Sequence, residues 1–231
     1  MRYSTLQKKW KRLLLIIPVM LLCSSLVSCG SSSSVSPALA ESSSSITVPA
    51  LGELKNLIYV PLARQATDYT CGVAALQSVL GYYGEDIRQD VLAEAMGSNE
   101  QDGTRYLRMV EYAQGKGYTV QVNQNMTVEN LKGFIDQKLP VIVLIQAWPD
   151  VPVDWATDYD DGHYVVAVGY DQNFMYFMDP STLGNFTYIP VAEFVERWHD
   201  KDGDGSILTR FGMIISKGTP SYDPQKLLPL N

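Results

Sequence analysis

Past residue 29 the chain holds a single cysteine, Cys71, and this limits how its folded part can be stabilised. No internal disulfide can form there except one that uses Cys29, so an apolar core must hold the domain together. In an oxidising compartment a structural cysteine normally has a partner, so an unpaired thiol indicates chemistry. The alternative is a buried, unreactive cysteine that packs as a small apolar side chain.

The N-terminal residues have the pattern of a secretion signal. Residues 1–28 combine a basic start with a short apolar run at 13–22, which is too short for a stable spanning helix. The run ends in Leu-Val-Ser-Cys-Gly at residues 26–30, which resembles a bacterial lipobox. That resemblance implies cleavage before Cys29 and lipid on Cys29, with the two or more acyl chains that stable anchoring requires. The alternative is an ordinary signal peptide with an incidental cysteine.

Composition divides the rest of the chain into three parts. Residues 29–53 form the lipidated cysteine and a serine-rich tether, which cannot bury enough apolar surface to become ordered. Residues 54–217 have the composition and length of one globular domain, and 218–231 form a C-terminal tail without an interpretable pattern. We therefore expect an extracytoplasmic domain that is lipid-anchored to a bacterial membrane.

The charge of the mature chain limits its partners. Residues 1–28 carry five of the 18 basic residues and none of the 25 acidic ones, so cleavage leaves 13 basic and 25 acidic residues, a net charge of −12. Such an acidic surface argues against nucleic acid or anionic lipid as partners and favours solubility. We expect a monomer that binds no nucleic acid and contacts the membrane through the anchor on Cys29.

Helical patterns dominate the first half of the domain and strand patterns the second half. Apolar spacing and stop residues predict helices at 71–83, 87–96, 104–115, 127–138 and 190–198. Alternation and continuous apolar runs predict strands at 57–60, 118–122, 141–146, 163–170, 174–178 and 210–216. Helices followed by strands are typical of the α+β class, so we expect a helical N-terminal part packed on an antiparallel sheet.

Cys71 begins the predicted helix 71–83, which is a favourable place for a nucleophilic thiol. The positive end of a helix lowers the pKa of a thiol, and the free backbone N–H groups there can donate to an oxyanion. Gln65, six residues upstream, offers a second donor through its side-chain amide, unless it is an ordinary surface loop residue. Gly72 would leave room beside the thiol for a substrate backbone.

A histidine and an aspartate complete a possible triad of side chains. If strands 163–170 and 174–178 form a hairpin that turns about Asp171, His163 and Asp179 lie opposite each other on one face of the sheet. Asp179 would then fix the imidazole tautomer and leave the other nitrogen for the thiol. The alternatives are a satisfied core histidine and an aspartate that only forms a turn. His199, at the expected helix end, is the competing base.

The order and context of these residues resemble the bacteriocin-processing, double-glycine leader peptidase family of cysteine peptidases, peptidase family thirty-nine. The residues that carry the resemblance are, in order, Gln65-x5-Cys71-Gly72, Asp161-Gly162-His163 and Met178-Asp179-Pro180. The resemblance covers residues 57 to 216 and implies a papain-like fold. It also implies a catalytic triad of Cys71, His163 and Asp179, with Gln65 at the oxyanion hole. Relatives that process bacteriocin leaders are fused to an export ATPase, whereas this chain has no phosphate-loop motif, so the substrate stays open.

The function that we expect is a membrane-tethered cysteine peptidase, a hydrolase that cleaves a peptide or protein substrate through a Cys71 acyl-thioenzyme without a cofactor. Two alternatives use the same fold. One is a cell-wall peptide endopeptidase or amidase, because an anchored lipoprotein lies near that substrate. The other is a peptide-binding module without turnover.

An acidic segment near the end of the domain predicts a second feature. Asp200, Asp202 and Asp204 alternate before Gly205, as in a calcium-binding loop. The twelfth position is Phe211, so the bidentate glutamate of such loops is missing. The pattern is compatible with a weak calcium loop or with an acidic turn, and we favour the turn.

Overall fold

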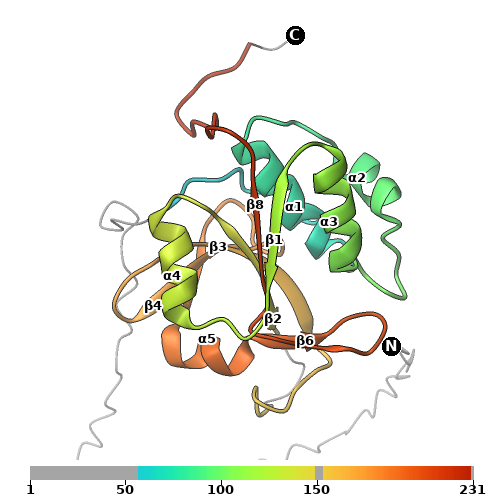
Figure 1. Cartoon of the computed structure of the whole chain (residues 1–231), viewed down its shortest axis with the longest axis vertical. Helices are drawn as coiled ribbons and strands as arrows, with labels where there is room; N and C mark the ends of the chain where they lie inside the picture. The colour runs from blue at the N-terminus through green and yellow to red at the C-terminus, as the bar shows by residue number, and fades with distance from the viewer. Residues whose placement is uncertain (1–56, 149–152, 230–231) are drawn as a thin grey trace, which may run out of the picture. The chain divides into compact units, whose positions relative to one another are not determined.

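The computed structural model describes residues 57–148 and 153–229. The predicted signal peptide, the predicted lipidation site Cys29 and the serine-rich tether lie outside the described residues. The described residues contain a six-stranded antiparallel sheet, with strands in the order β1-β8-β2-β3-β4-β5, and a separate two-stranded β6-β7 hairpin (Figure 1). The sequence predicted this α+β architecture, and the structure confirms it.

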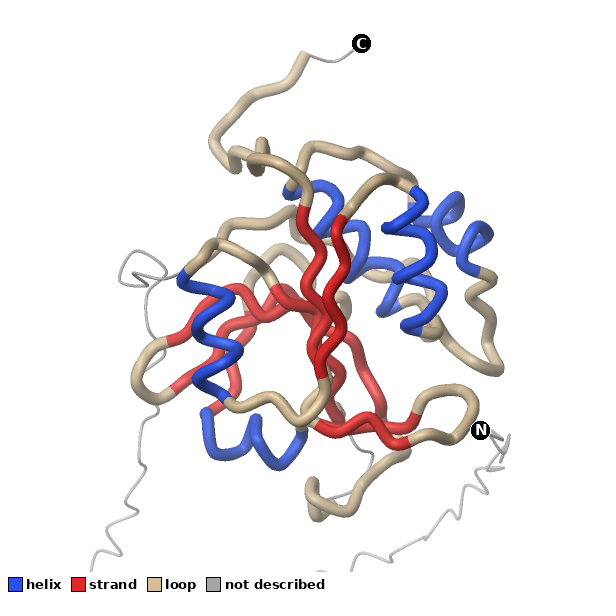
Figure 2. The backbone as a smooth tube through the Cα atoms, in the orientation of Figure 1, coloured by secondary structure: helices blue, strands red, loops and turns tan. Residues whose placement is uncertain are grey.

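Five helices flank the large sheet in the described part of the chain. They form two groups on different sides of the sheet (Figure 2). The first group is α1 (Cys71–Tyr82), α2 (Gln89–Met96) and α3 (Tyr106–Gly115), and the second is α4 (Val128–Asp136) and α5 (Val191–Arg197). Thr127 and Asn130 begin α4 with a reciprocal capping box, which explains why the helix starts there.

The strands of the large sheet come mostly from the second half of the domain. They are β1 (Thr119–Asn123), β2 (Val141–Gln146), β3 (Gly162–Tyr170), β4 (Phe174–Met178), β5 (Thr187–Pro190) and β8 (Gly212–Ser216). All six residues of β2 are buried, as their continuous apolar run predicted. The central strands β2 and β3 therefore form the core of the molecule, with α1 packed on β3.

The sequence prediction was wrong in several details of the strands. Residues 57–60 are not a strand, although the Ile58 amide donates to the Val168 carbonyl at 2.7 Å and so lies beside β3. The sequence pattern also missed β5 and the short hairpin of β6 (His199–Lys201) and β7 (Ile207–Thr209). Strands of three or four residues contain too few positions to show an alternating pattern.

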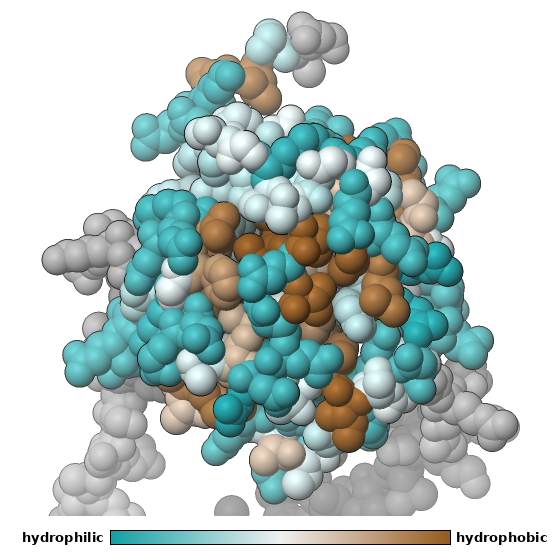
Figure 3. Space-filling view, viewed as in Figure 1, coloured by the Kyte–Doolittle hydropathy of each residue, from teal (hydrophilic) through white to brown (hydrophobic). Residues whose placement is uncertain are grey.

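The face seen in Figure 1 is largely hydrophilic and carries apolar areas. Figure 3 shows apolar residues in the middle of this face, bordered by polar ones. Val122 of β1 and Leu107 of α3 are among the exposed apolar side chains, with 37% and 48% of their surface accessible. No helix in the described ranges is long and apolar enough to cross a membrane.

Candidate active site

Cys71 is the first residue of α1 and is half-buried at the helix N-terminus. The N-cap residue Thr70 makes no side-chain capping bond, and the first turn of α1 holds no acidic residue. The Thr70 hydroxyl instead bonds to Thr67 in the preceding turn. The positive end of the helix is therefore neither capped nor neutralised by these side chains, which favours negative charge on the thiol.

The thiol of Cys71 interacts with His163 near the start of β3. Burial is the largest influence and raises the pKa of Cys71, but the hydrogen bond and charge of His163 oppose it. Backbone hydrogen bonds from Tyr164 and Gly72 also lower the pKa of the thiol. The net pKa of Cys71 lies below its ordinary value, so the site favours a thiolate.

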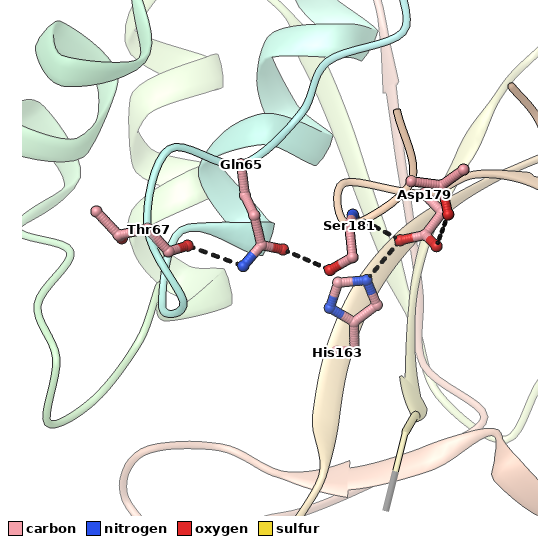
Figure 4. Close-up of polar contacts among 6 residues, drawn as sticks. Gln65, Thr67, His163, Asp179 and Ser181 are labelled. Atoms are coloured by element: carbon pink, nitrogen blue, oxygen red, sulfur yellow. Dashed lines mark hydrogen bonds and ion pairs between the residues drawn. The ribbon is translucent and has the colours of Figure 1, made fainter. Parts of the chain in front are cut away.

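The imidazole of His163 lies between the thiol and a carboxylate. Its Nε2 is 2.9 Å from Asp179 Oδ1, which leaves Nδ1 for Cys71 (Figure 4). Burial is the largest influence and lowers the pKa of His163, but the hydrogen bonds with Asp179 and Cys71 outweigh it and raise the pKa to about 9. A depressed thiol pKa and a raised imidazole pKa together favour a thiolate–imidazolium pair.

Asp179 directly follows β4 and is buried. Its Oδ1 also accepts a hydrogen bond from the Ser181 amide at 2.9 Å, and its Oδ2 accepts one from the Thr182 hydroxyl at 2.8 Å. Burial is the largest influence and raises the pKa of Asp179, but these bonds and His163 lower it overall. The carboxylate therefore stays ionised beside the imidazole.

The sequence predicted the His163–Asp179 contact, but the register that it used was wrong. The hairpin turns at residues 172–173 rather than about Asp171, and Tyr170 pairs with Met175. A β-bulge at residue 168 then shifts the register, so that Val166 pairs with Met178. If the pairing seen near the turn continued to the end of β4, Asp179 would lie opposite Val166. Its side chain would then be on the other face of the sheet from His163. The bulge restores the shared face, as bulges near active sites do when they re-aim a side chain.

Gln65 lies on the loop before α1, beside the turn that follows Asp179. Its backbone amide donates to the Pro180 carbonyl at 2.9 Å. Its side-chain Nε2 donates to the Thr67 carbonyl at 2.8 Å, and its Oε1 accepts from the Ser181 hydroxyl at 3.1 Å (Figure 4). The structure thus places the predicted oxyanion donor next to the Cys71–His163–Asp179 group.

Sequence reasoning missed three residues that contact this group. Ser181 and Thr182 cap the Asp179 carboxylate, and the spacing Asp-Pro-Ser-Thr could have indicated such a turn. Trp148 lies edge-on to His163, with ring centroids 4.6 Å apart, and 55% of its surface is exposed. No sequence pattern marks Trp148, because its role depends on where β2 ends relative to β3.

Two glycines make room for neighbouring protein side chains. A Cβ on Gly72 would lie 2.8 Å from Thr104 Cβ and 3.1 Å from a Tyr164 ring carbon. Gly72 therefore admits these side chains, and the expectation that it leaves space for a substrate backbone was wrong. A Cβ on Gly162 would lie 1.9 Å from Asp200 Oδ2, so the residue before His163 packs against a buried carboxylate.

The Gly162→Ala substitution should destabilise the fold near the site. Asp200 cannot move freely, because Gln146 donates to its Oδ1 at 3.0 Å and pairs with Gly162 across β2 and β3. Overpacking of this kind costs about 1–3 kcal/mol, so the free energy of unfolding in a denaturant titration should fall by that amount. Gly133→Ala is the control, since open space surrounds its Cβ in mid-helix and the change should stabilise by about 0.5–1 kcal/mol. Equal stability of the Gly162 variant and the wild type would contradict the packing argument.

His199, the competing base, is engaged elsewhere. It begins β6, after α5 has ended at Arg197, rather than terminating a helix as expected. Its Nε2 is 2.9 Å from the Trp155 carbonyl, and its ring lies 4.5 Å from that of Tyr159. Burial lowers the pKa of His199, against a smaller opposing effect of Asp158. The histidine that interacts with Cys71 is the other one, His163.

The acidic segment forms the turn of the β6-β7 hairpin. The Asp202 amide donates to the Ser206 carbonyl at 2.9 Å, and Arg105 lies 3.6 Å from carboxylate oxygens of both Asp202 and Asp204. Asp200 instead bonds with Gln146. Within the described ranges, no three His, Cys, Asp or Glu side chains are grouped so that they could hold a metal ion. These contacts favour the acidic turn, and calcium binding stays a prediction.

A groove of about 460 Å³ lies between β1 and α4, apart from the Cys71 site. Polar amide side chains predominate in its lining, and none of the Cys71, His163, Asp179 and Gln65 side chains contributes to it. The groove and the thiol site are therefore separate features of the surface.

Comparison with known proteins places this geometry in a family. Residues 57–204 match the Peptidase_C39 like family. Two curated relatives, both the transport/processing ATP-binding protein ComA from strains of Streptococcus pneumoniae, are 28% identical over 135 residues. The match covers 58% of this chain but only 17% of each relative, so it concerns one part of those larger proteins.

Solved structures share the fold. The peptidase domain of Streptococcus ComA, a bi-functional ABC transporter, has a TM-score of 0.53 and 22% identity, covering 70% of this chain and 99% of that domain. A C39-like peptidase from Bacillus anthracis has a TM-score of 0.55 and 18% identity, and the match covers 72% of this chain and 98% of that chain. A double glycine motif protease bound to a leader peptide has a TM-score of 0.50 and 21% identity, and the match covers 72% of this chain and 96% of that chain. The chain belongs to the Peptidase_C39 like family of cysteine-type peptidases.

Proposed function

We propose that this chain is a membrane-tethered cysteine peptidase that hydrolyses peptide bonds through an acyl-thioenzyme on Cys71. The observation that carries the proposal is the series of interacting side chains from Cys71 through His163 to Asp179, at a helix N-terminus. A nucleophile, a base and a group that orients the base are the parts that covalent catalysis requires. Membership of the family supports the same chemistry.

The resting site would be a thiolate–imidazolium pair. His163 Nδ1 takes the proton of the Cys71 thiol, while Nε2–H donates to the ionised Asp179. The lowered pKa of Cys71 and the raised pKa of His163 support this distribution of the proton. The nucleophile is then formed before the substrate arrives.

In the first chemical step the Cys71 thiolate attacks the carbonyl carbon of the scissile bond. Negative charge moves to the carbonyl oxygen, where the Cys71 backbone N–H and the second Nε2 hydrogen of Gln65 would donate to it. The first Nε2 hydrogen of Gln65 is already bonded to the Thr67 carbonyl. Fixed donors of this kind stabilise a developing oxyanion without reorganisation.

Two proton transfers by His163 complete the cycle. The imidazolium gives its Nδ1 proton to the leaving amine as the carbon–nitrogen bond breaks, which leaves a thioester on Cys71. The neutral imidazole then takes a proton from a water molecule that attacks the thioester. The products are a carboxylic acid and the regenerated pair of Cys71 thiolate and His163 imidazolium, so the reaction needs no cofactor.

The substrate class that we propose is a peptide or a protein segment. A related structure contains a double glycine motif protease in complex with its leader peptide. The experiment offers the purified chain a double-glycine leader peptide and, separately, purified peptidoglycan stem peptides, with Cys71→Ser as the control. Cleavage of either that Cys71→Ser abolishes would support the peptidase, and the preferred substrate would decide between leader and cell-wall activity. Binding of a peptide without cleavage would favour the non-catalytic module.

We propose that lipid on Cys29 tethers the domain outside a bacterial membrane. The basic residues, the apolar run and the Leu-Val-Ser-Cys-Gly segment of the N-terminus support this location. Cys29→Ser should move the protein from the membrane pellet to the soluble fraction, because it removes the acylation site. Equal membrane retention of both proteins would exclude this anchor.

A further inference from the structure

Ser181 contacts two parts of the proposed site at once. Its backbone amide donates to Asp179 Oδ1, the oxygen that also faces His163, and its hydroxyl donates to Gln65 Oε1 at 3.1 Å. Figure 4 shows this series of contacts running from His163 through Asp179 and Ser181 to Gln65. One residue therefore joins the carboxylate that orients the base to the amide beside the thiol.

The contacts of Gln65 define which way its amide group faces. The Thr67 carbonyl can only accept a hydrogen bond, so the group 2.8 Å from it must be Nε2 of Gln65. The Oε1 atom then faces Ser181, whose hydroxyl must donate. Without the Ser181 hydroxyl, one of the two bonds that hold this orientation is lost.

The backbone around Gln65 is held independently of Ser181. The Gln65 amide donates to the Pro180 carbonyl at 2.9 Å. Gln89 at the start of α2 donates to the Arg64 carbonyl at 2.7 Å and accepts from the Ala66 amide at 3.0 Å. Removal of the Ser181 hydroxyl should therefore leave the Gln65 side-chain amide held only by its bond to Thr67, while its backbone stays in place.

We propose that Ser181 is a positioning residue that orients the Gln65 amide toward the oxyanion. This inference rests on the proposed function, since an oxyanion forms only if Cys71 attacks a carbonyl. The donated hydrogen bond also polarises the Gln65 amide, which makes its N–H groups stronger donors. Ser181 thus acts through Gln65 and has no need to touch the substrate.

The kinetic test combines Ser181→Ala with Gln65→Ala. Alanine keeps the backbone bond from residue 181 to Asp179 and removes only the hydroxyl. Loss of an oxyanion donor lowers kcat by about 10²-fold or more, so kcat of Gln65→Ala should fall by that factor. The kcat of Ser181→Ala should fall by about tenfold, because the donor remains but is less well oriented. The double variant should be no slower than Gln65→Ala alone, because both changes affect one interaction. Ser181→Thr should restore the rate, since threonine keeps the hydroxyl.

Alkylation of Cys71 by iodoacetamide distinguishes positioning from structural damage. Alkylation needs the thiolate but forms no tetrahedral oxyanion, so its pH profile should be the same in Ser181→Ala and the wild type. Thr182→Ala is the matched control, because Thr182 donates to Asp179 and has no bond to Gln65. The fold loss of kcat in the double variant of Thr182→Ala and Gln65→Ala should equal the product of the two single losses, because the two changes act independently.

A second readout does not depend on turnover. The side-chain NH₂ signals of Gln65 in a ¹⁵N-labelled full chain, assigned by their loss in Gln65→Ala, should move in Ser181→Ala and stay in place in Thr182→Ala. Unmoved signals in Ser181→Ala, kinetic effects that multiply, or an altered alkylation profile would each overturn the inference. If the wild type cleaves no peptide, the proposed function fails, and the NMR result still decides whether Ser181 orients Gln65.

Discussion

His163→Ala should lower kcat for peptide hydrolysis by about 10³–10⁴-fold, because His163 is the proposed base for Cys71 and the acid for the leaving amine. Both roles follow from its position, with Nε2 bound to Asp179 and the other ring nitrogen left for the thiol. The measurement is steady-state hydrolysis of the substrate found for the wild type. Each rate is divided by the concentration of reactive Cys71 thiol in that preparation.

His199→Ala is the matched control for this substitution. His199 is the second histidine of the chain, and its Nε2 is occupied by the Trp155 carbonyl. We expect His199→Ala to lower the free energy of unfolding rather than kcat, because removal of the imidazole leaves a gap beside Trp155 and Tyr159. Comparable losses of kcat in the two variants, or a His163 variant that keeps the kcat of the wild type, would contradict the assignment of the base.

Asp179→Asn should move the basic limb of the pH–rate profile to lower pH. The imidazolium of His163 is the active form, and its raised pKa of about 9 means that activity is lost as the pH rises through that value. Replacing the carboxylate with a neutral amide removes a negative charge 2.9 Å from Nε2, so the imidazolium loses its proton at a lower pH. The thiol and the imidazole titrate together, so the profile reports apparent pKa values of the pair.

The profile of kcat/KM should be recorded from about pH 5 to about pH 10 for both proteins. Asp171→Asn is the control, because Asp171 belongs to the same hairpin but bonds with Tyr176 and the turn amides instead. Its basic limb should coincide with that of the wild type. A limb that stays in place in Asp179→Asn would show that Asp179 does not set the charge of the imidazole.

The start of α1 and the strand β2 could be predicted because their patterns are local. Cys71 follows a turn and opens a helical apolar pattern, and β2 is a continuous buried run. The pairing of His163 with Asp179 was predicted from the wrong register. The bulge at Val168 escapes prediction because β3 is apolar and buried on both faces, so no alternation reveals an extra residue.

The contacts around Gln65 depend on tertiary structure. Gln65 and Ser181 are 116 residues apart in sequence and meet only because two loops pair through Gln65 and Pro180. The packing of Gly162 against Asp200 likewise depends on the β6-β7 hairpin folding over β2 and β3. Short-range patterns carry no information about such contacts, which explains why Gln65 was predicted without its supporting residue.

The most direct test of the site is alkylation of Cys71 by iodoacetamide across pH, in wild type and His163→Ala. Peptide mass spectrometry would follow Cys71 separately from the N-terminal cysteines. We predict that wild-type Cys71 reacts with an apparent pKa below the free thiol value of about 8.5, and that this pKa rises in His163→Ala. A Cys71 that is inert, or that titrates as a free thiol in both proteins, would contradict the Cys71–His163 pair and the peptidase with it.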